Sequence, residues 1–171
     1  MNSGLYKLLL LCHLLTVIVG FGSVVLNGVY GAESKNRQGP TGLAVLQANK
    51  RVSLLAEKLI YLVPVFGILL VLDSDKALKF SQTWIWLSLV LYVVGIGVSH
   101  GVMIPAVNKM EAAAEELNAM GPPPQGASPS GPPPQVAVME ELGKRLAAGG
   151  MFLNLLLVVI VALMVWKPGF P

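Results

Sequence analysis

The chain has 171 residues, of which 54% are hydrophobic and 12% are charged, and its formal net charge is +3. Charged residues are about half as frequent as in an average globular protein, where they make up ~25%. The apolar residues gather in four blocks that could not face water on a folded surface. The composition therefore excludes a soluble enzyme. It also excludes a nucleic-acid partner, because the basic residues form no stripe.

The first apolar block, residues 8–30, contains no charged residue. At ~1.5 Å per residue, a helix of this length crosses the ~30 Å hydrocarbon core of a bilayer. The block is also longer than the apolar part of a secretory signal peptide, which is about 7–15 residues. We therefore predict an uncleaved transmembrane helix over residues 8–30.

The second and third spans are predicted over residues 52–72 and 83–107. A loop over residues 34–40 and an amphipathic helix from Thr41 precede the second span. That span includes Glu57 and Lys58 near one end, where a long lysine side chain can reach the polar interface. A short polar turn at Asp73–Lys76 leads into the third span, so the two spans should run antiparallel as neighbours.

The fourth span is predicted over residues 147–166. Residues 110–120 are strong helix formers that should prolong the third span beyond the membrane. The motif Gly-Pro-Pro-Pro-Gln then occurs twice, beginning at Gly121 and Gly131, and consecutive prolines favour an extended chain. Residues 121–136 are accordingly predicted as a Pro-rich linker, either a spacer or a docking segment for a proline-reading domain.

These elements predict an all-α protein with a single membrane domain, residues 1–171. The domain is a polytopic bundle of four transmembrane helices, with the Pro-rich loop between helices 3 and 4. Lysine and arginine are commoner on the cytoplasmic side of membrane proteins. One side of the predicted bundle carries Lys35, Arg37, Lys50, Arg51, Lys58, Lys109, Lys144 and Arg145, and the other carries Lys7, Lys76, Lys79 and Lys167. This asymmetry predicts that both termini lie outside the cytoplasm, in a bacterial cytoplasmic membrane.

Polar residues inside the spans are the candidates for function, because hydrocarbon offers them no partner. Counting ~1.5 Å per residue from the outer side places Tyr61 and Tyr92 near the midplane. The same count places Glu57, His100 and Asn27 at ~22–28 Å, in the inner half. Glu57 and His100, with Asn27 at the same depth, can form a polar relay for a proton. Alternatively, Glu57 turns toward the headgroups and His100 bonds a backbone carbonyl.

His13 and Cys12 are the candidate ligands for haem b or copper, at ~6–8 Å from the outer side. His13 and His100 differ in depth by ~18 Å, so the two histidines cannot both ligate one iron. His13 remains as a single ligand. The alternative is an ordinary histidine without metal, because Cys12 and His13 are consecutive and face different directions on a helix.

Small residues line two of the predicted spans. Small-residue faces let transmembrane helices approach closely. This predicts a contact between spans one and three within one chain, or else a dimer face. The residues are Gly20, Ser23, Asn27 and Gly31 in the first span and Gly97 and Gly101 in the third.

No nucleophile, base and orienting group can converge in this sequence, and it contains no glycine loop for phosphate. An enzymatic activity is therefore not indicated. The expected partners are the lipid bilayer, a second copy of the chain or a larger membrane complex.

The segment from Lys7 to Leu15, with His13 and the later Gly20-Phe-Gly22, resembles the opening of small bacterial four-helix membrane proteins. These are integral-membrane families of unknown function that group with copper-resistance D-like and HemJ-like proteins. The resemblance implies a four-helix membrane fold. In HemJ-like proteins the histidine of the first span is associated with haem, a role that would fall on His13. Sequence alone thus favours an accessory or helix-packing component of a membrane complex, with a haem- or copper-associated redox protein as the alternative.

Overall fold

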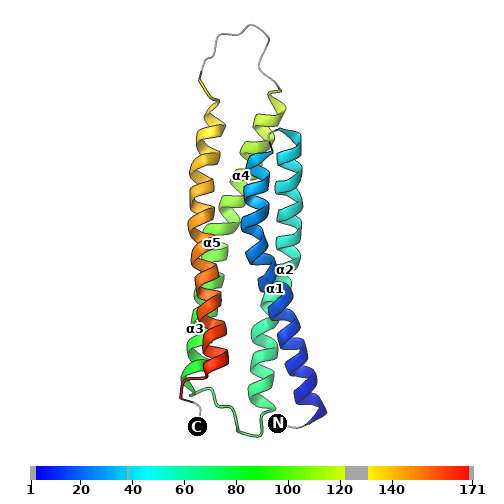
Figure 1. Ribbon diagram of the computed structural model, residues 1–171, viewed down its shortest axis with the longest axis vertical. Coiled ribbons are helices and arrows are strands. Elements are labelled where there is room, and N and C mark those ends of the chain that lie inside the picture. The colour runs from blue at the N-terminus through cyan, green and yellow to red at the C-terminus, as the bar shows by residue number, and fades with distance from the viewer. Residues whose placement is uncertain (1–2, 38, 122–130, 170–171) are drawn as a thin grey trace.

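The computed structural model describes residues 3–37, 39–121 and 131–169. Four long helical rods lie side by side, and both termini lie at the same end of the bundle (Figure 1). The first two rods are α1 (Gly4–Asn36) and α2 (Pro40–Leu72). The third contains α3 (Thr83–Val98), the π-helix η1 (Ser99–Met103) and α4 (Ile104–Ala119), and the fourth is α5 (Pro134–Trp166). No strand occurs among these residues, and the predicted all-α class is confirmed.

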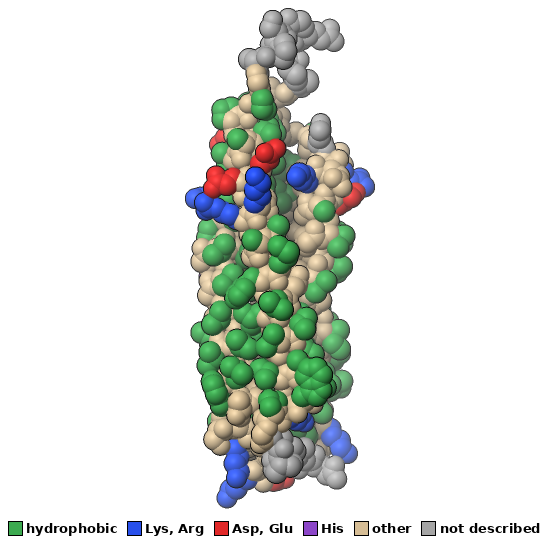
Figure 2. All heavy atoms as spheres, turned by 60° about the vertical axis from the view of Figure 1, so that its left-hand side comes forward, with side chains coloured by type: hydrophobic (Ala, Val, Ile, Leu, Met, Phe, Trp, Pro, Cys, Tyr) green, Lys and Arg blue, Asp and Glu red, His purple; other side chains and the backbone are tan. Residues whose placement is uncertain are grey.

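Each rod is long and apolar enough to cross a membrane. Large apolar side chains point outward along the rods, and Ile18, Val93, Leu155 and Val158 are all more than 60% exposed. Figure 2 shows apolar side chains over the middle of the molecule and charged side chains at its two ends. A bilayer solvates such a surface, whereas water does not. The predicted four-helix membrane bundle is therefore confirmed.

The helices extend beyond the predicted spans. The helix expected from Thr41 and the span expected over residues 52–72 are one continuous helix, α2. The helix α5 begins at Pro134, inside the segment predicted as linker, because proline is well tolerated in the first helical turn. Residues 122–130, which hold most of that predicted linker, lie outside the described residues.

The helices α1 and α2 form a hairpin and pack against each other along their length. Only residues 37–39 separate the two helices, and Gly39 adopts a positive φ of 66°. Gly42 lies so close to the end of α1 that an added Cβ would be 1.8 Å from the Arg37 carbonyl oxygen. The Ser34 hydroxyl also donates a hydrogen bond to the Gly42 carbonyl oxygen, at 2.8 Å. The absent side chain of Gly42 is what allows this turn.

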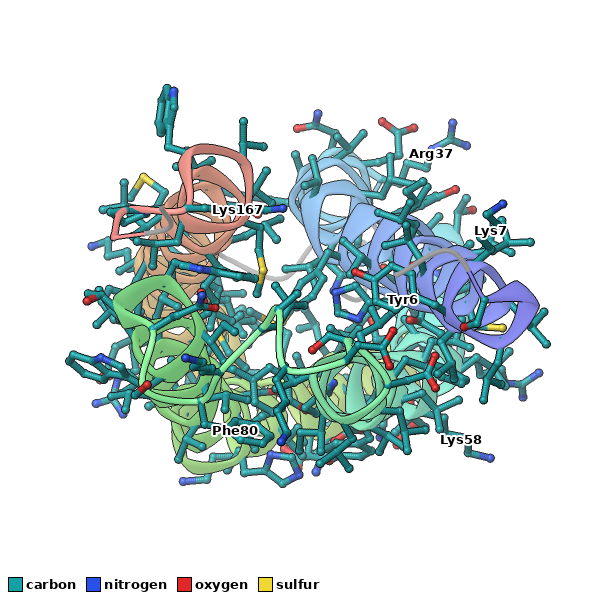
Figure 3. The ribbon with its side chains drawn as sticks, turned by 90° about the horizontal axis from the view of Figure 1, so that it is seen from below. Tyr6, Lys7, Arg37, Lys58, Phe80 and Lys167 are labelled. Carbon is teal, nitrogen blue, oxygen red and sulfur yellow. The ribbon has the colours of Figure 1, made fainter. Side chains whose placement is uncertain are left out.

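The predicted packing between spans one and three is wrong for the described residues. A Cβ at Gly20 would lie 3.1 Å from the Ile60 side chain, so the small face of α1 contacts α2 instead. The helix α3 packs against α5, where Gly95 faces Leu153. Viewed from below, α1 and α2 form one pair and α3 and α5 lie beside each other across the bundle (Figure 3). The short α1–α2 connection enforces this pairing.

The π-helix η1 joins α3 to α4 without a break in the rod. Its wider turn is visible in the hydrogen bond from the Ile104 amide to the Ser99 carbonyl oxygen, five residues earlier. Pro105 follows directly and has no amide hydrogen for the carbonyl four residues before it. Proline and π-turns are common causes of such irregularity, and π-turns occur frequently at functional sites.

Candidate functional site

Glu57, Tyr61 and His100 meet between α2 and η1. The Tyr61 hydroxyl donates a hydrogen bond to Glu57 Oε1 at 2.5 Å, and its oxygen is 2.8 Å from His100 Nε2. His100 Nε2 is also 3.1 Å from Glu57 Oε1. The rings of Tyr61 and His100 are tilted by 38°, with their centroids 6.1 Å apart. We call these three side chains the polar triad.

The two helices present the triad for different local reasons. Glu57 and Tyr61 are four residues apart on α2, which puts their side chains on one face. His100 lies in the π-helix, and its other ring nitrogen, Nδ1, is 3.1 Å from the Ile96 carbonyl oxygen. A carbonyl oxygen only accepts hydrogen bonds, so Nδ1 carries a hydrogen. This bond directs Nε2 toward α2.

The polar triad lies within the apolar length of the bundle but at its periphery. Glu57 is fifteen residues from the end of α2 at Leu72, or ~22 Å along the helix. The side chains of Glu57 and His100 are 22% and 47% exposed. The neighbouring Lys58 points away from the bundle (Figure 3). The structure thus brings together Glu57 and His100, which the sequence paired, and adds Tyr61, to which the sequence gave no role.

Asn27 lies apart from the triad. Its Oδ1 accepts a hydrogen bond from the Ser53 hydroxyl at 3.0 Å, and the same hydroxyl is 2.8 Å from the Asn49 carbonyl oxygen. Asn27 therefore belongs to the contact between α1 and α2. The relay predicted for Asn27 together with Glu57 and His100 is therefore not seen among the described contacts, because the sequence could not show which helix Asn27 would face.

His13 contacts α2 on another side. Its Nδ1 is 3.0 Å from the Val63 carbonyl oxygen, and a Cβ at Gly67 would lie 3.3 Å from its Cε1. The ring therefore fits against a glycine and donates its Nδ1 hydrogen to the backbone of α2. Nε2 makes none of the hydrogen bonds seen among the described residues. Histidines that ligate a metal or haem usually donate their other ring nitrogen to a carbonyl or carboxylate, and His13 Nδ1 makes such a bond.

Cys12 is a free, partly buried thiol next to His13. The Thr16 hydroxyl is within hydrogen-bond distance of the Cys12 and His13 carbonyl oxygens, at 2.9 and 2.8 Å. Among the described residues, no group of three or more His, Cys, Asp or Glu side chains is arranged to hold a metal ion. His13 can therefore offer a single nitrogen ligand.

His13 lies ~14 Å along α1 from the first residue of the helix, Gly4. His13 contacts α2 at Val63 and Gly67, and His100 contacts it at Glu57 and Tyr61. The centres of these two pairs are six residues apart, or ~9 Å along the helix. Six residues also turn a helix by about 120°, so the two rings lie on different sides of α2. They still cannot share one iron, because α2 separates them.

Tyr92 satisfies a backbone group that Pro64 leaves free. Pro64 lies inside α2 and has no amide hydrogen to donate to the Ile60 carbonyl oxygen. The Tyr92 hydroxyl from α3 donates to that oxygen instead, at 3.2 Å. In hydrocarbon an unsatisfied carbonyl is costly. This hydrogen bond joins α3 to α2 near the middle of the bundle. The sequence could not predict it, because it depends on how the two helices pack.

The predicted helix-packing residues have different surroundings. Gly20 contacts α2. The Ser23 hydroxyl donates a hydrogen bond within its own helix, to the Val19 carbonyl oxygen. A Cβ added at Gly31, Gly97 or Gly101 would have no described heavy atom within 4 Å, leaving aside the adjacent residues and the backbone of its own helix. The two glycines of the third rod therefore face outward.

A polar groove lies above the triad, between α2 and α4, and we call it the α2–α4 groove. Within it Lys50 forms an ion pair with Glu111, and the Gln47 side-chain amide donates to Glu115 at 3.1 Å. The groove is lined by Gln47, Lys50, Arg51, Leu54 and Glu111.

A family model described as "Predicted integral membrane protein (DUF2269)" matches residues 7–168 of the chain. The match covers nearly the whole chain and reaches into all four rods. No curated protein and no solved structure matches the chain.

Proposed function

Because the chain belongs to this family of integral membrane proteins, we propose that it acts as a non-enzymatic component of a membrane complex. It associates through the outer face of α3, either with a second copy or with other membrane subunits. Lysine and arginine are in excess at the end of the bundle that carries the α4–α5 connection, as is typical of the cytoplasmic side. We therefore further propose that both termini lie outside the cytoplasm.

The outward position of Gly97 and Gly101 supports this proposal. A Cβ at either position would meet no described heavy atom within 4 Å, neighbouring backbone aside. Trp86 and Val93 lie on the same face of the third rod and are 46% and 67% exposed. Two glycines spaced by four residues allow a second helix to approach closely, so that packing replaces the hydrophobic force absent in lipid. Trp86, about three turns before Gly97 on this face, extends the contact along the helix.

We expect Gly97→Leu to weaken association about tenfold, equivalent to about 1.4 kcal/mol, because the added side chain keeps a second helix at a distance. The measurement is native mass spectrometry or cross-linking of the protein in mild detergent. Gly22→Leu is the matched control, since Gly22 on α1 also has open space around it. A wild-type protein that is monomeric and carries no partner contradicts the proposal.

The second candidate function is a haem- or copper-associated redox protein with His13 as ligand. The observation that favours it is the hydrogen bond between His13 Nδ1 and the Val63 carbonyl oxygen, which leaves Nε2 as the nitrogen with a lone pair. The resemblance of the first span to copper-resistance D-like and HemJ-like proteins agrees with this role.

For this candidate we expect the purified protein to show a Soret band or stoichiometric copper, and His13→Ala to remove it completely. His100→Ala is the control and retains the signal, because His100 lies on another side of α2. Optical spectra and metal analysis of the detergent-purified protein provide the measurement. A colourless and metal-free preparation from cells supplied with haem and copper rejects this candidate.

A further inference from the structure

We propose that Glu57, Tyr61 and His100 form a proton-binding site within the membrane, in which one exchangeable proton is shared between the carboxylate and the imidazole. This site is independent of whether the chain associates with a partner. It differs from the simple pairing expected from sequence because it includes Tyr61.

The proposal rests on the number of hydrogens available for the hydrogen bonds of the triad. Three atoms, Tyr61 Oη, Glu57 Oε1 and His100 Nε2, lie 2.5, 2.8 and 3.1 Å from one another. Tyr61 supplies one hydrogen, and its bond to Oε1 uses that hydrogen. The histidine hydrogen on Nδ1 is directed to the Ile96 carbonyl oxygen and cannot contribute. Without a further proton, the lone pairs of Nε2 and Oε1 would face each other.

One added proton resolves this contact in either of two ways. On Nε2 it produces an imidazolium that donates toward the Tyr61 and Glu57 oxygens, with the carboxylate still ionised. On Oε1 it produces a carboxylic acid that donates to Nε2, with the imidazole neutral. In both arrangements the triad has no net charge, whereas loss of the proton leaves one negative charge. Apolar surroundings penalise that net charge, which favours the proton-loaded site.

The α2–α4 groove brings polar surface close to this site. Lys50, Leu54, Glu57 and Tyr61 follow one another at spacings of four, three and four residues, so they share a face of α2. Lys50 and Leu54 line the groove, and Glu57 lies one turn further along the same face. The groove therefore lies on the side of the triad that faces the α4–α5 connection.

The charged and titratable groups around the triad are few. Lys58 is adjacent on α2 and points outward (Figure 3). The Lys50–Glu111 ion pair lies in the groove between α2 and α4, and Tyr92 of α3 bonds the backbone of α2. On α5, Gly149 lies against Met103 of η1, and the nearest charged residues in sequence are Lys144 and Arg145. The shared proton is thus held by Glu57 and His100.

The test is a pH titration of the full-length protein in lipid nanodiscs, followed by nuclear magnetic resonance. The chain has only two histidines, so ring-¹⁵N labelling gives two sets of signals, and His100→Gln identifies those of His100. Carboxyl-¹³C labelling of glutamate follows Glu57. We expect the His100 and Glu57 signals to change over the same pH interval, because coupled groups titrate as a pair.

Glu57→Gln should move the His100 transition to a different pH interval, since it removes the carboxylate that shares the proton. His100→Gln should move the Glu57 transition reciprocally, and this also provides the test if Glu57→Gln does not fold. Glu33→Gln is the control, because Glu33 pairs with Arg37 at the end of α1, and it should leave both transitions in place. Separate transitions in the wild type, or a His100 transition unmoved by Glu57→Gln, would overturn the proposal.

Discussion

Replacing Gly42 by alanine should lower the free energy of unfolding by about 3 kcal/mol, the upper range for overpacked positions. The added Cβ would lie 1.8 Å from the Arg37 carbonyl oxygen and 2.8 Å from that of Ser34. Both are backbone atoms, so no side-chain rotation relieves the overlap. The connection between α1 and α2 would have to open, which would disturb the most extensive helix pairing in the bundle.

Unfolding of micelle-bound protein, followed by circular dichroism, measures this effect. Gly28→Ala is the matched control, because its Cβ position on α1 is open. Alanine is favoured over glycine inside a helix by up to ~1 kcal/mol, so this control should be neutral or slightly more stable. Equal stability of Gly42→Ala and the wild type would show that the turn has a different geometry.

Tyr92→Phe should cost about 1 kcal/mol, because it leaves the Ile60 carbonyl oxygen without a donor in the apolar interior. The dependence on Pro64 makes this prediction specific. In a Pro64→Ala background the alanine amide can donate to the Ile60 oxygen, and Tyr92→Phe should then cost close to nothing. The difference between the two backgrounds is a coupling energy of about 1 kcal/mol.

The same unfolding assay, applied to the wild type, both single variants and the double variant, completes this cycle. Tyr30→Phe is the control, because Tyr30 is 44% exposed near the end of α1 and its hydroxyl makes none of the side-chain hydrogen bonds seen in the described chain. A cost for Tyr92→Phe that is the same with proline or alanine at position 64 would contradict the role of the hydroxyl.

The apolar blocks of the sequence predicted the four helices because each block must satisfy its own backbone hydrogen bonds in lipid. The helix formers at residues 110–120 also predicted that the third rod continues beyond the membrane, and α4 does continue to Ala119. The start of α5 was harder to predict, since it begins at Pro134, inside the predicted linker. Composition decides whether a segment crosses a membrane, but not where its last turn ends.

The helix that each small-residue face contacts could not be predicted from the sequence. Gly20 and Gly97 carry similar small-residue signals, yet Gly20 contacts Ile60 of α2 and Gly97 faces outward. The signal indicates close approach without indicating the partner. The same holds for the candidate site: depth along the helices paired Glu57 with His100, whereas the contacts of Tyr61 and Asn27 depend on how α1, α2 and η1 are rotated.

The π-helix at Ser99–Met103 has a consequence for the other end of its rod. One extra residue in a turn shifts the phase of everything after it by about 100° on a helical wheel. With this offset Glu111 of α4 faces Lys50 of α2. A chain shortened by one residue within the π-turn would form an ordinary α-helical turn there, and the carboxylates of α4 would rotate away from the basic residues of α2.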